Sequence, residues 1–360
     1  MAARSRGFCE RSERNQGMAS VLTGIGWHMV GAAAAASFYA PIEKVKRWSW
    51  ETTWVIAGIF SWVLLPLLVS RILLADFFSF YSIIPGHVLV LTFLFGCMWG
   101  VGNVSYGLTM RYLGMSLGIG VAIGVTLVVG TLIPPMAHGR LGSLLATRAG
   151  HFTIAGVVLA LLGIAVVSWA GHQKEQRMGI QTEEFSVSKG LLLAILCGIF
   201  SSGMSFAMDA ARPMAVAAQQ AGVKPLYAAL PSYVIIMGGG ALINFSYCFF
   251  RLLFRQELSL RRDLAEPQRI LLRNGGMAAC GGIMWYLQFF FYAWGQANIP
   301  VHLAYINWML HMSLYVLFGG LVGLALGEWR EAQGRPVRLL WVGMLMIILA
   351  ANLVGLGAAS

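Results

Sequence analysis

The sequence has little charge for its length, and this scarcity decides the class of protein. Only 11% of its 360 residues are Asp, Glu, Lys or Arg, whereas 58% are hydrophobic, and the mean hydropathy is +0.72. A soluble globular domain carries about 25% charged residues. The composition therefore predicts an integral membrane protein and argues against an ordinary soluble enzyme.

Motifs that hold metals, disulfides or nucleotides are also missing. The five cysteines form no C-x-x-C pair and no spacing with histidine that is typical of a metal site. The chain has no P-loop and no glycine-rich dinucleotide fingerprint that follows a strand. We therefore expect no cofactor, no metal and no ATP hydrolysis. Any active transport has to draw its energy from an ion gradient.

Long apolar runs are what the sequence has instead. A helix needs about 20 apolar residues to cross the hydrocarbon core of a bilayer. The runs are continuous and do not alternate apolar and polar residues, as the strands of a membrane barrel do. The fold class expected is an all-α integral membrane protein with ten transmembrane helices, near 21–41, 53–74, 87–109, 114–137, 152–171, 190–208, 226–250, 276–294, 303–326 and 338–358.

The basic residues predict the orientation of these helices. Of the 25 Lys and Arg residues, 16 fall in the loops after the first, third, fifth, seventh and ninth segments. Cytoplasmic loops are the ones enriched in basic residues, so both termini are expected on the periplasmic side. The net charge of +11 then reflects loops that contact anionic lipid, and nucleic-acid binding is not expected.

Two short patterns recur in the two halves of the chain. Met98-Trp99 precedes Tyr106-Gly107 at the same spacing as Met284-Trp285 precedes Tyr292-Ala293, and Ser37-Phe38 recurs as Ser205-Phe206. Two copies of five helices are inverted relative to each other, because five is odd, and transporters commonly bind substrate between inverted repeats. We expect a polar extension at 1–20 that could be disordered, a first repeat at 21–171, a cytoplasmic linker at 172–189 and a second repeat at 190–360.

Three ionisable residues lie within the predicted spans: His28, Asp209 and His311. An ionisable side chain inside a bilayer is costly and is a functional candidate by default. A histidine takes and releases a proton near neutral pH, and a buried carboxylate can be shifted into that range. The three are therefore the candidates for proton coupling, although each could equally be a hydrogen-bonded structural residue.

Aromatic and amide side chains predict a binding site for a neutral polyol. Aromatic rings stack on the C–H face of a sugar, and amides and phenols offer hydrogen bonds to its hydroxyls. Equivalent helices of the two repeats each carry such a face, although aromatic stripes also pack cores and line membrane interfaces. The predicted site residues are Trp99, Asn103, Tyr106, Trp285, Gln288, Tyr292, Tyr39 and Trp308.

Longer motifs resemble a known family. The runs that carry the resemblance begin at Ser37, Lys44, Tyr106, Gly203, Met284 and Trp308, and read SFYAP, KVKRWSWE, YGLTMRYLGMSLGIG, GMSFAM, MWYLQFFFYAWG and WMLHMS. They resemble the bacterial L-rhamnose-proton symporter family of the drug/metabolite transporter superfamily, from about Gly24 to the C-terminus. This resemblance implies ten helices in two inverted repeats, residence in the bacterial inner membrane and uptake of L-rhamnose with protons.

The sequence departs from the family pattern at two positions. An acidic residue of the pattern is replaced by Ala304, seven positions before His311, and Asp209 replaces an amide. The departures leave open which residue couples the proton, and whether the sugar is rhamnose or a close 6-deoxyhexose. The alternatives are a drug or metabolite exporter of the same superfamily, an intramembrane transferase, and a sugar sensor without transport. The sequence does not indicate an oligomeric state.

Overall fold

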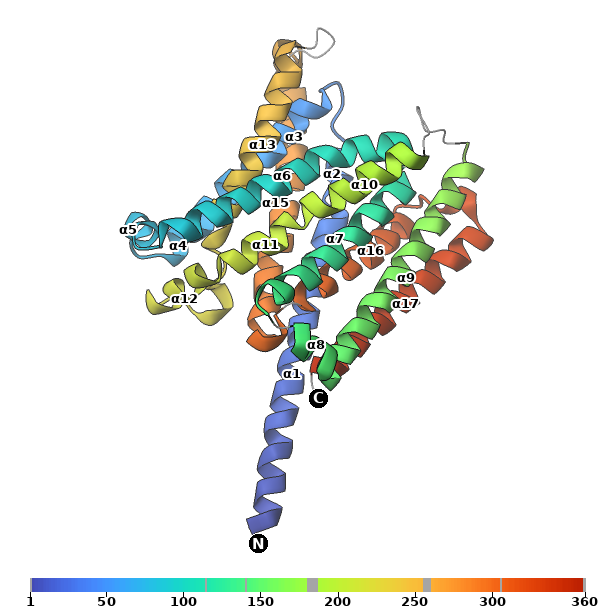
Figure 1. The fold of residues 1–360 in the computed structure, drawn as a ribbon. Coiled ribbons are helices and arrows are strands. Elements are labelled where there is room, and N and C mark those ends of the chain that lie inside the picture. Colours follow the sequence, from blue (N-terminus) through green and yellow to red (C-terminus); the bar gives the residue numbers. More distant parts are fainter. Residues whose placement is uncertain are drawn as a thin grey trace.

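The computed structural model describes residues 2–113, 115–139, 141–179, 187–254, 260–304 and 306–358. The regular secondary structure of these residues is entirely helical, and they contain no strand (Figure 1). The helices that carry the predicted spans are α1 (Ala2–Ser37), α3 (Trp50–Gly58) with the π-helix η1 (Ile59–Leu64) and α4 (Leu65–Leu73), α6 (Gly86–Leu113), α7 (Met115–Ala137), α9 (Arg148–Arg177), α10 (Val187–Ser201) with α11 (Gly203–Ala210) and α12 (Arg212–Gln220), α13 (Ser232–Phe254), α15 (Gln268–Ala297), α16 (Ile306–Ala325) and α17 (Arg335–Ala358). Short helices in the connections are α2 (Tyr39–Ile42), α5 (Phe77–Ser82), α8 (Leu141–Ala146), α14 (Leu260–Leu264), η2 (Pro225–Tyr227), η3 (Val301–Leu303) and η4 (Arg330–Ala332).

The all-α membrane class is confirmed. Nine helical segments in the described part of the chain are long and apolar enough to cross a bilayer. The predicted segment 276–294 is not among them, although it lies in α15, which is 30 residues long. Glycine, tryptophan, tyrosine and Gln288 lower the hydropathy of α15. The count of ten spans and the inverted repeat stay predictions.

The predicted domain boundaries fall within helices α1, α9 and α10. Residues 2–20 continue α1 as helix, and this N-terminal part projects beyond the rest of the bundle (Figure 1). The linker at 172–189 begins inside α9, which ends at Arg177, and its residues 180–186 lie outside the described structure. The division of the chain into two repeats is a prediction that these boundaries do not test.

Close helix contacts depend on small residues. At the crossing of α6 and α13, a Cβ at Gly96 would overlap the carbonyl oxygen of Ile236, and a Cβ at Gly239 would overlap that of Phe93. In lipid, helices associate by such tight packing, because burial of apolar surface from water contributes little. The two glycines therefore let α6 and α13 approach backbone to backbone.

A buried carboxylate fastens the loop before α15 to the start of α3. Oδ2 of Asp263 accepts hydrogen bonds from the Ser49 amide at 2.9 Å, from the Thr52 hydroxyl at 2.7 Å and from the Ser49 hydroxyl. The Asp263 side chain is fully buried. Burial raises the pKa of this carboxyl, but the hydrogen bonds from Ser49 and Thr52 outweigh burial and hold the pKa below its usual value.

We expect Asp263→Leu to lower the stability of the protein at pH 7 by about 2–4 kcal/mol, because three donors lose a buried acceptor. A carboxyl whose pKa is lowered by folding stabilises the fold above its unfolded pKa of about 3.9. This contribution disappears as the pH falls through the lowered pKa. Thermal unfolding in detergent should therefore show a large difference between variant and wild type at pH 7, and this difference should shrink progressively as the pH falls below about 3.9. The exposed Glu331→Leu serves as control, and equal melting temperatures for Asp263→Leu and wild type at pH 7 would contradict the role of Asp263.

Candidate functional site

A central cavity lies where α3, α6, α7, α10, α15 and α16 meet. Its volume is about 140 Å³. Six of the eight predicted sugar-site residues line it: Trp99, Asn103, Tyr106, Trp285, Gln288 and Trp308. Tyr292 and Tyr39 do not line it: Tyr292 is buried beside it, where its ring contacts Trp308, and Tyr39 is 43% exposed. Residues of both halves of the chain thus converge on one space.

Two tryptophans of the cavity are fixed by their indole nitrogens. Trp308 Nε1 donates to the carbonyl oxygen of Thr126 at 2.9 Å, which ties α16 to α7. Trp54 Nε1 donates to Oδ1 of Asn244 at 3.1 Å, which ties α3 to α13. Because both N–H groups are occupied, these two side chains present ring surface to the cavity. Rigid ring faces of this kind suit the C–H face of a sugar.

Three other donors around the cavity have no acceptor among the described residues. They are Nδ2 of Asn103, Nε1 of Trp285 and Nε2 of Gln288, and all three atoms are buried. A buried donor without an acceptor costs about 1–3 kcal/mol. A ligand that brings several acceptor oxygens into the cavity recovers this free energy. The cavity is therefore chemically suited to a hydroxylated molecule.

The cavity is also electrically neutral. No Asp, Glu, Lys or Arg is found among the described residues that line it, and its remaining polar groups include the side chains of Thr126, Ser201 and Tyr315. Its volume is smaller than the roughly 300 Å³ at which sites for drug-sized ligands begin. Size and charge together favour a small neutral polyol over a bulky or ionised ligand.

Next to the cavity, α1, α15 and α16 bury a cluster of polar side chains. Nε2 of His28 lies 2.8 Å from Oδ1 of Asn307, and the rings of His28 and His311 are 5.9 Å apart. Nε2 of His311 lies 3.4 Å from Oε1 of Gln288, which also lines the cavity. Both histidines are fully buried. Gln288 therefore connects the predicted proton site to the predicted sugar site.

The third proton candidate occupies a different position. Asp209 is at the end of α11, where Oδ1 lies 2.8 Å from Nε of Arg212 and Oδ2 lies 2.7 Å from Nε2 of His138. In the described structure no hydrogen bond, ion pair or ring contact joins Asp209 to His28 or His311. Asp209 connects the end of α7 to α11 and α12. Its predicted role in proton coupling stays a prediction.

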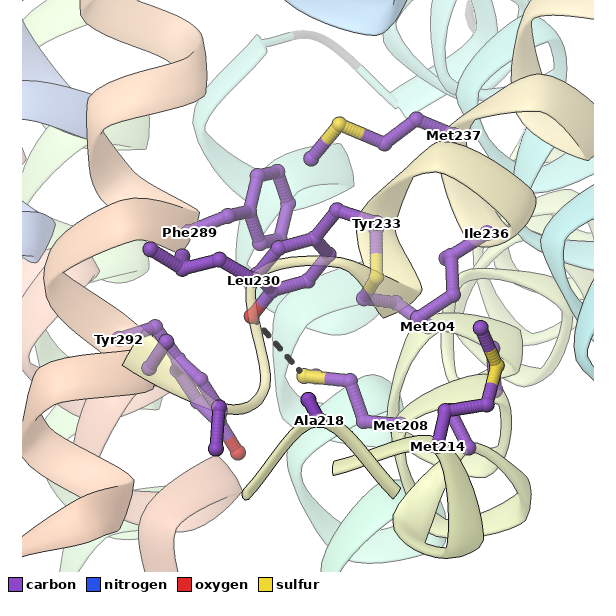
Figure 2. Close-up of a cluster of buried hydrophobic side chains, with 14 of the residues drawn as sticks. Met204, Met208, Met214, Ala218, Leu230, Tyr233, Ile236, Met237, Phe289 and Tyr292 are labelled. Atoms are coloured by element: carbon purple, nitrogen blue, oxygen red, sulfur yellow. Dashed lines mark hydrogen bonds between the residues drawn. The ribbon is translucent and has the colours of Figure 1, made fainter. Parts of the chain in front are cut away.

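A second cavity lies beyond Asp209. It has a volume of about 270 Å³ and is lined by residues of α11, α12, α13 and α15, among them Arg212, Tyr233 and the departing position Ala304. Phe289 lines the central cavity, Tyr233 lines the second one, and their ring centroids are 5.7 Å apart. Figure 2 shows these two rings within a layer of methionine, leucine and isoleucine side chains, where Tyr233 donates to Sδ of Met208. This apolar layer separates the two cavities.

Several of these residues were not predicted from the sequence. Asn307 stands four positions before His311, a spacing that places both on one helical face, and this signal could have identified it. Trp54 and Thr126 had no such signal, because neither predicted span carries another candidate residue. Ser201 stands four positions before Ser205 and eight before Asp209, a helical spacing that could have identified it.

Comparison with known proteins gives a consistent result. Residues 18–360 match the model of the family described as L-rhamnose-proton symport protein. The chain is similar to the L-rhamnose-proton symporter of Mannheimia succiniciproducens, with 59% identity over 341 residues, which cover 95% of this chain and 99% of the relative. It is 57% identical to the symporter of that name from Cronobacter sakazakii and 58% identical to the one from Yersinia pestis, with the same coverage.

The family match spans nearly the whole chain, and the identities to these relatives lie far above the level at which only a fold is shared. The chain therefore belongs to the L-rhamnose-proton symport protein family.

Proposed function

We propose that the protein imports L-rhamnose, or a close 6-deoxyhexose, together with protons across the bacterial inner membrane. The observation that carries this proposal is the set of three buried donors, on Asn103, Trp285 and Gln288, that surround a neutral cavity. The hydroxyl and ring oxygens of a sugar accept hydrogen bonds from such donors. Relatives with this family's name, at 57–59% identity, support the same substrate and coupling ion.

The rival functions receive less support. An exporter of cationic drugs requires an acid in its binding cavity, and the described lining of the central cavity contains none. The relatives are named as symporters and not as enzymes. The described residues contain no group of three or more His, Cys, Asp or Glu that could hold a metal. A sugar sensor differs from a symporter only in net flux, which the uptake assays below measure.

Alternating access between two inverted repeats is supported by the packing of the helices. α1 packs on α15 and α16, as α10 packs on α6 and α7, and the last helices of the predicted repeats, α9 and α17, lie side by side (Figure 1). If the two predicted repeats are exchanged, the contacts of α1 become those of α10, and the contact between α9 and α17 stays the same. Halves with equivalent contacts can exchange inward- and outward-facing shapes at similar free energy.

We propose that His28 and His311 carry the coupled proton. They are buried side by side, and only one of two positive rings at this distance is readily accommodated in an apolar interior. Gln288 transmits the state of the pair to the cavity, because its oxygen faces His311 and its amide nitrogen is left for the sugar. Protonation from outside then favours sugar binding, and proton release inside favours sugar release.

Replacement of the two amide side chains that line the cavity tests the proposed sugar site. Gln288→Leu and Asn103→Leu each remove a donor, so the KM for uptake of labelled L-rhamnose into proteoliposomes should rise about three- to tenfold. Gln220→Leu, an exposed glutamine of α12 outside both cavities, should leave the KM unchanged. If both cavity variants keep the wild-type KM, the sugar binds elsewhere.

Replacement of the histidines tests the proton site. His28→Gln and His311→Gln should abolish accumulation driven by a pH gradient, because neither side chain can then bind a proton. Exchange of internal for external rhamnose at equal pH should persist, since exchange needs no net proton movement. The exposed His87→Gln is the matched control. Asp209→Asn is measured in parallel. Loss of accumulation in this variant alone would show that Asp209, and not the histidine pair, carries the coupled proton.

The proposed orientation places both termini in the periplasm. A single cysteine in place of Glu266, in the loop before α15, should then be protected from an impermeant thiol reagent in intact cells. A cysteine in place of Ser82, at the end of α5, should react under the same conditions. Both substitutions are made in a background without the five native cysteines. The opposite labelling pattern would reverse the assignment of the two sides.

A further inference from the structure

The orientation of the Asn307 side chain is determined by the backbone just before its helix, at the end of η3. Nδ2 of Asn307 donates to the carbonyl oxygen of Ala304 at 2.8 Å. A carbonyl oxygen can only accept a hydrogen bond, so the amide nitrogen has to face Ala304. The amide oxygen Oδ1 must then face the other way, toward His28. The side chain is fully buried, so no solvent competes for either group.

This orientation determines which nitrogen of His28 carries a hydrogen. Oδ1 of Asn307 can only accept, and it lies 2.8 Å from Nε2 of His28, so Nε2 must be the donor. A neutral imidazole has one N–H, and the other nitrogen keeps its lone pair. In the neutral ring the lone pair is therefore on Nδ1. Nδ1 is buried and has no partner among the described residues.

The surroundings of His28 hold the ring in this position. A Cβ at Gly295 would lie 2.7 Å from Cδ2 and from Nε2, so the edge of the ring rests directly on the backbone of α15. The titratable groups that face the ring are Tyr292 of α15 at 4.9 Å and His311 of α16 at 5.9 Å. α17 also packs on α1, but its only charged residues, Arg335 and Arg338, are in its first turn.

We propose that Asn307 is a positioning residue that fixes the tautomer of His28, so that the transported proton binds at Nδ1. The proton adds to the lone pair of Nδ1, no bond in the ring breaks, and the ring becomes an imidazolium whose Nε2–H stays bonded to Asn307. The inference rests on the proposed function for its role in transport. The tautomer itself does not depend on transport.

The tautomer can be read directly from the wild-type protein. Nitrogen-15 spectra distinguish a ring nitrogen that carries hydrogen from one that carries a lone pair. Trp27-His28 is the one Trp-His pair among the seven histidines, so carbon-13 carbonyl tryptophan combined with histidine labelled with carbon-13 and nitrogen-15 assigns the His28 ring without any substitution. We expect Nε2–H and a bare Nδ1 in the neutral state, with hydrogen appearing at Nδ1 on acidification. A neutral His28 with hydrogen on Nδ1 would overturn the inference.

Transport by variants provides the second test. Asn307→Leu removes the acceptor, and we expect the pH-driven accumulation of rhamnose to fall about tenfold or more, with a mixture of His28 tautomers in the spectrum. Asn307→Asp keeps an acceptor oxygen for Nε2–H, so the Nε2–H form should persist. Its negative charge favours the imidazolium, so hydrogen should appear at Nδ1 at a higher pH than in the wild type. Asn352→Leu is the matched control, because Asn352 makes a similar side-chain bond to the carbonyl of Ile348 on the exposed face of α17.

The two tests separate failure of the inference from failure of the proposed function. Wild-type accumulation by Asn307→Leu, in a protein that transports rhamnose, would show that Asn307 does not position the proton site. If the wild type moves no rhamnose, the proposed function fails, and the spectra alone decide the tautomer. An Asn307→Leu variant that does not fold leaves the wild-type spectrum and Asn307→Asp as the deciding measurements.

Discussion

The hydrogen bond between His28 and Asn307 is the interaction on which the proposed coupling depends. Inside a membrane no water is at hand to satisfy a polar group, so each buried imidazole must find its partner within the protein. For His28 that partner is an amide whose own orientation is fixed by a backbone carbonyl. As a result, Nε2 of His28 is hydrogen-bonded, and Nδ1 has no partner among the described residues.

The same constraint connects the proposed proton site to the proposed sugar site. Gln288 lines the cavity, its side-chain oxygen lies 3.4 Å from Nε2 of His311, and its amide nitrogen is buried without an acceptor among the described residues. A change in the charge of the histidine pair therefore acts on a side chain that also contacts the space for the sugar. Linkage requires that if the proton strengthens sugar binding, the sugar strengthens proton binding by the same factor. The proposed coupling therefore involves residues of α1, α15 and α16.

Much of this arrangement could be predicted from the sequence. The helical segments follow from long apolar runs, and the pairing of Trp99 and Asn103 with Trp285 and Gln288 follows from a repeated pattern at helical spacing. α15 illustrates the limit of hydropathy. It is central to the site, and for that reason it carries the polar and small residues that make it look least like a membrane span. The convergence of six predicted residues on one cavity was expected from the repeat, and their roles in binding stay a proposal.

The remaining features depend on distances between helices, which no single helix encodes. Asp209 and His28 both lie in predicted spans, yet Asp209 lies against His138 at the end of α7, and His28 is buried against Asn307 of α16. Likewise, the ring of His28 can lie on α15 only because residue 295 is glycine. Sequence patterns identify ionisable residues within a membrane. The contacts between helices decide which of these residues keeps a buried atom without a hydrogen-bond partner, as His28 does at Nδ1.

The most direct test of the coupling is proton uptake on sugar binding, measured in weakly buffered detergent solution with a pH indicator and no membrane gradient. We predict that L-rhamnose makes the wild-type protein take up protons near neutral pH, and that a variant with both His28→Gln and His311→Gln binds the sugar without proton uptake. Uptake of the same size in that double variant, or none in a wild type that binds rhamnose, would contradict the assignment of the proton to the histidine pair.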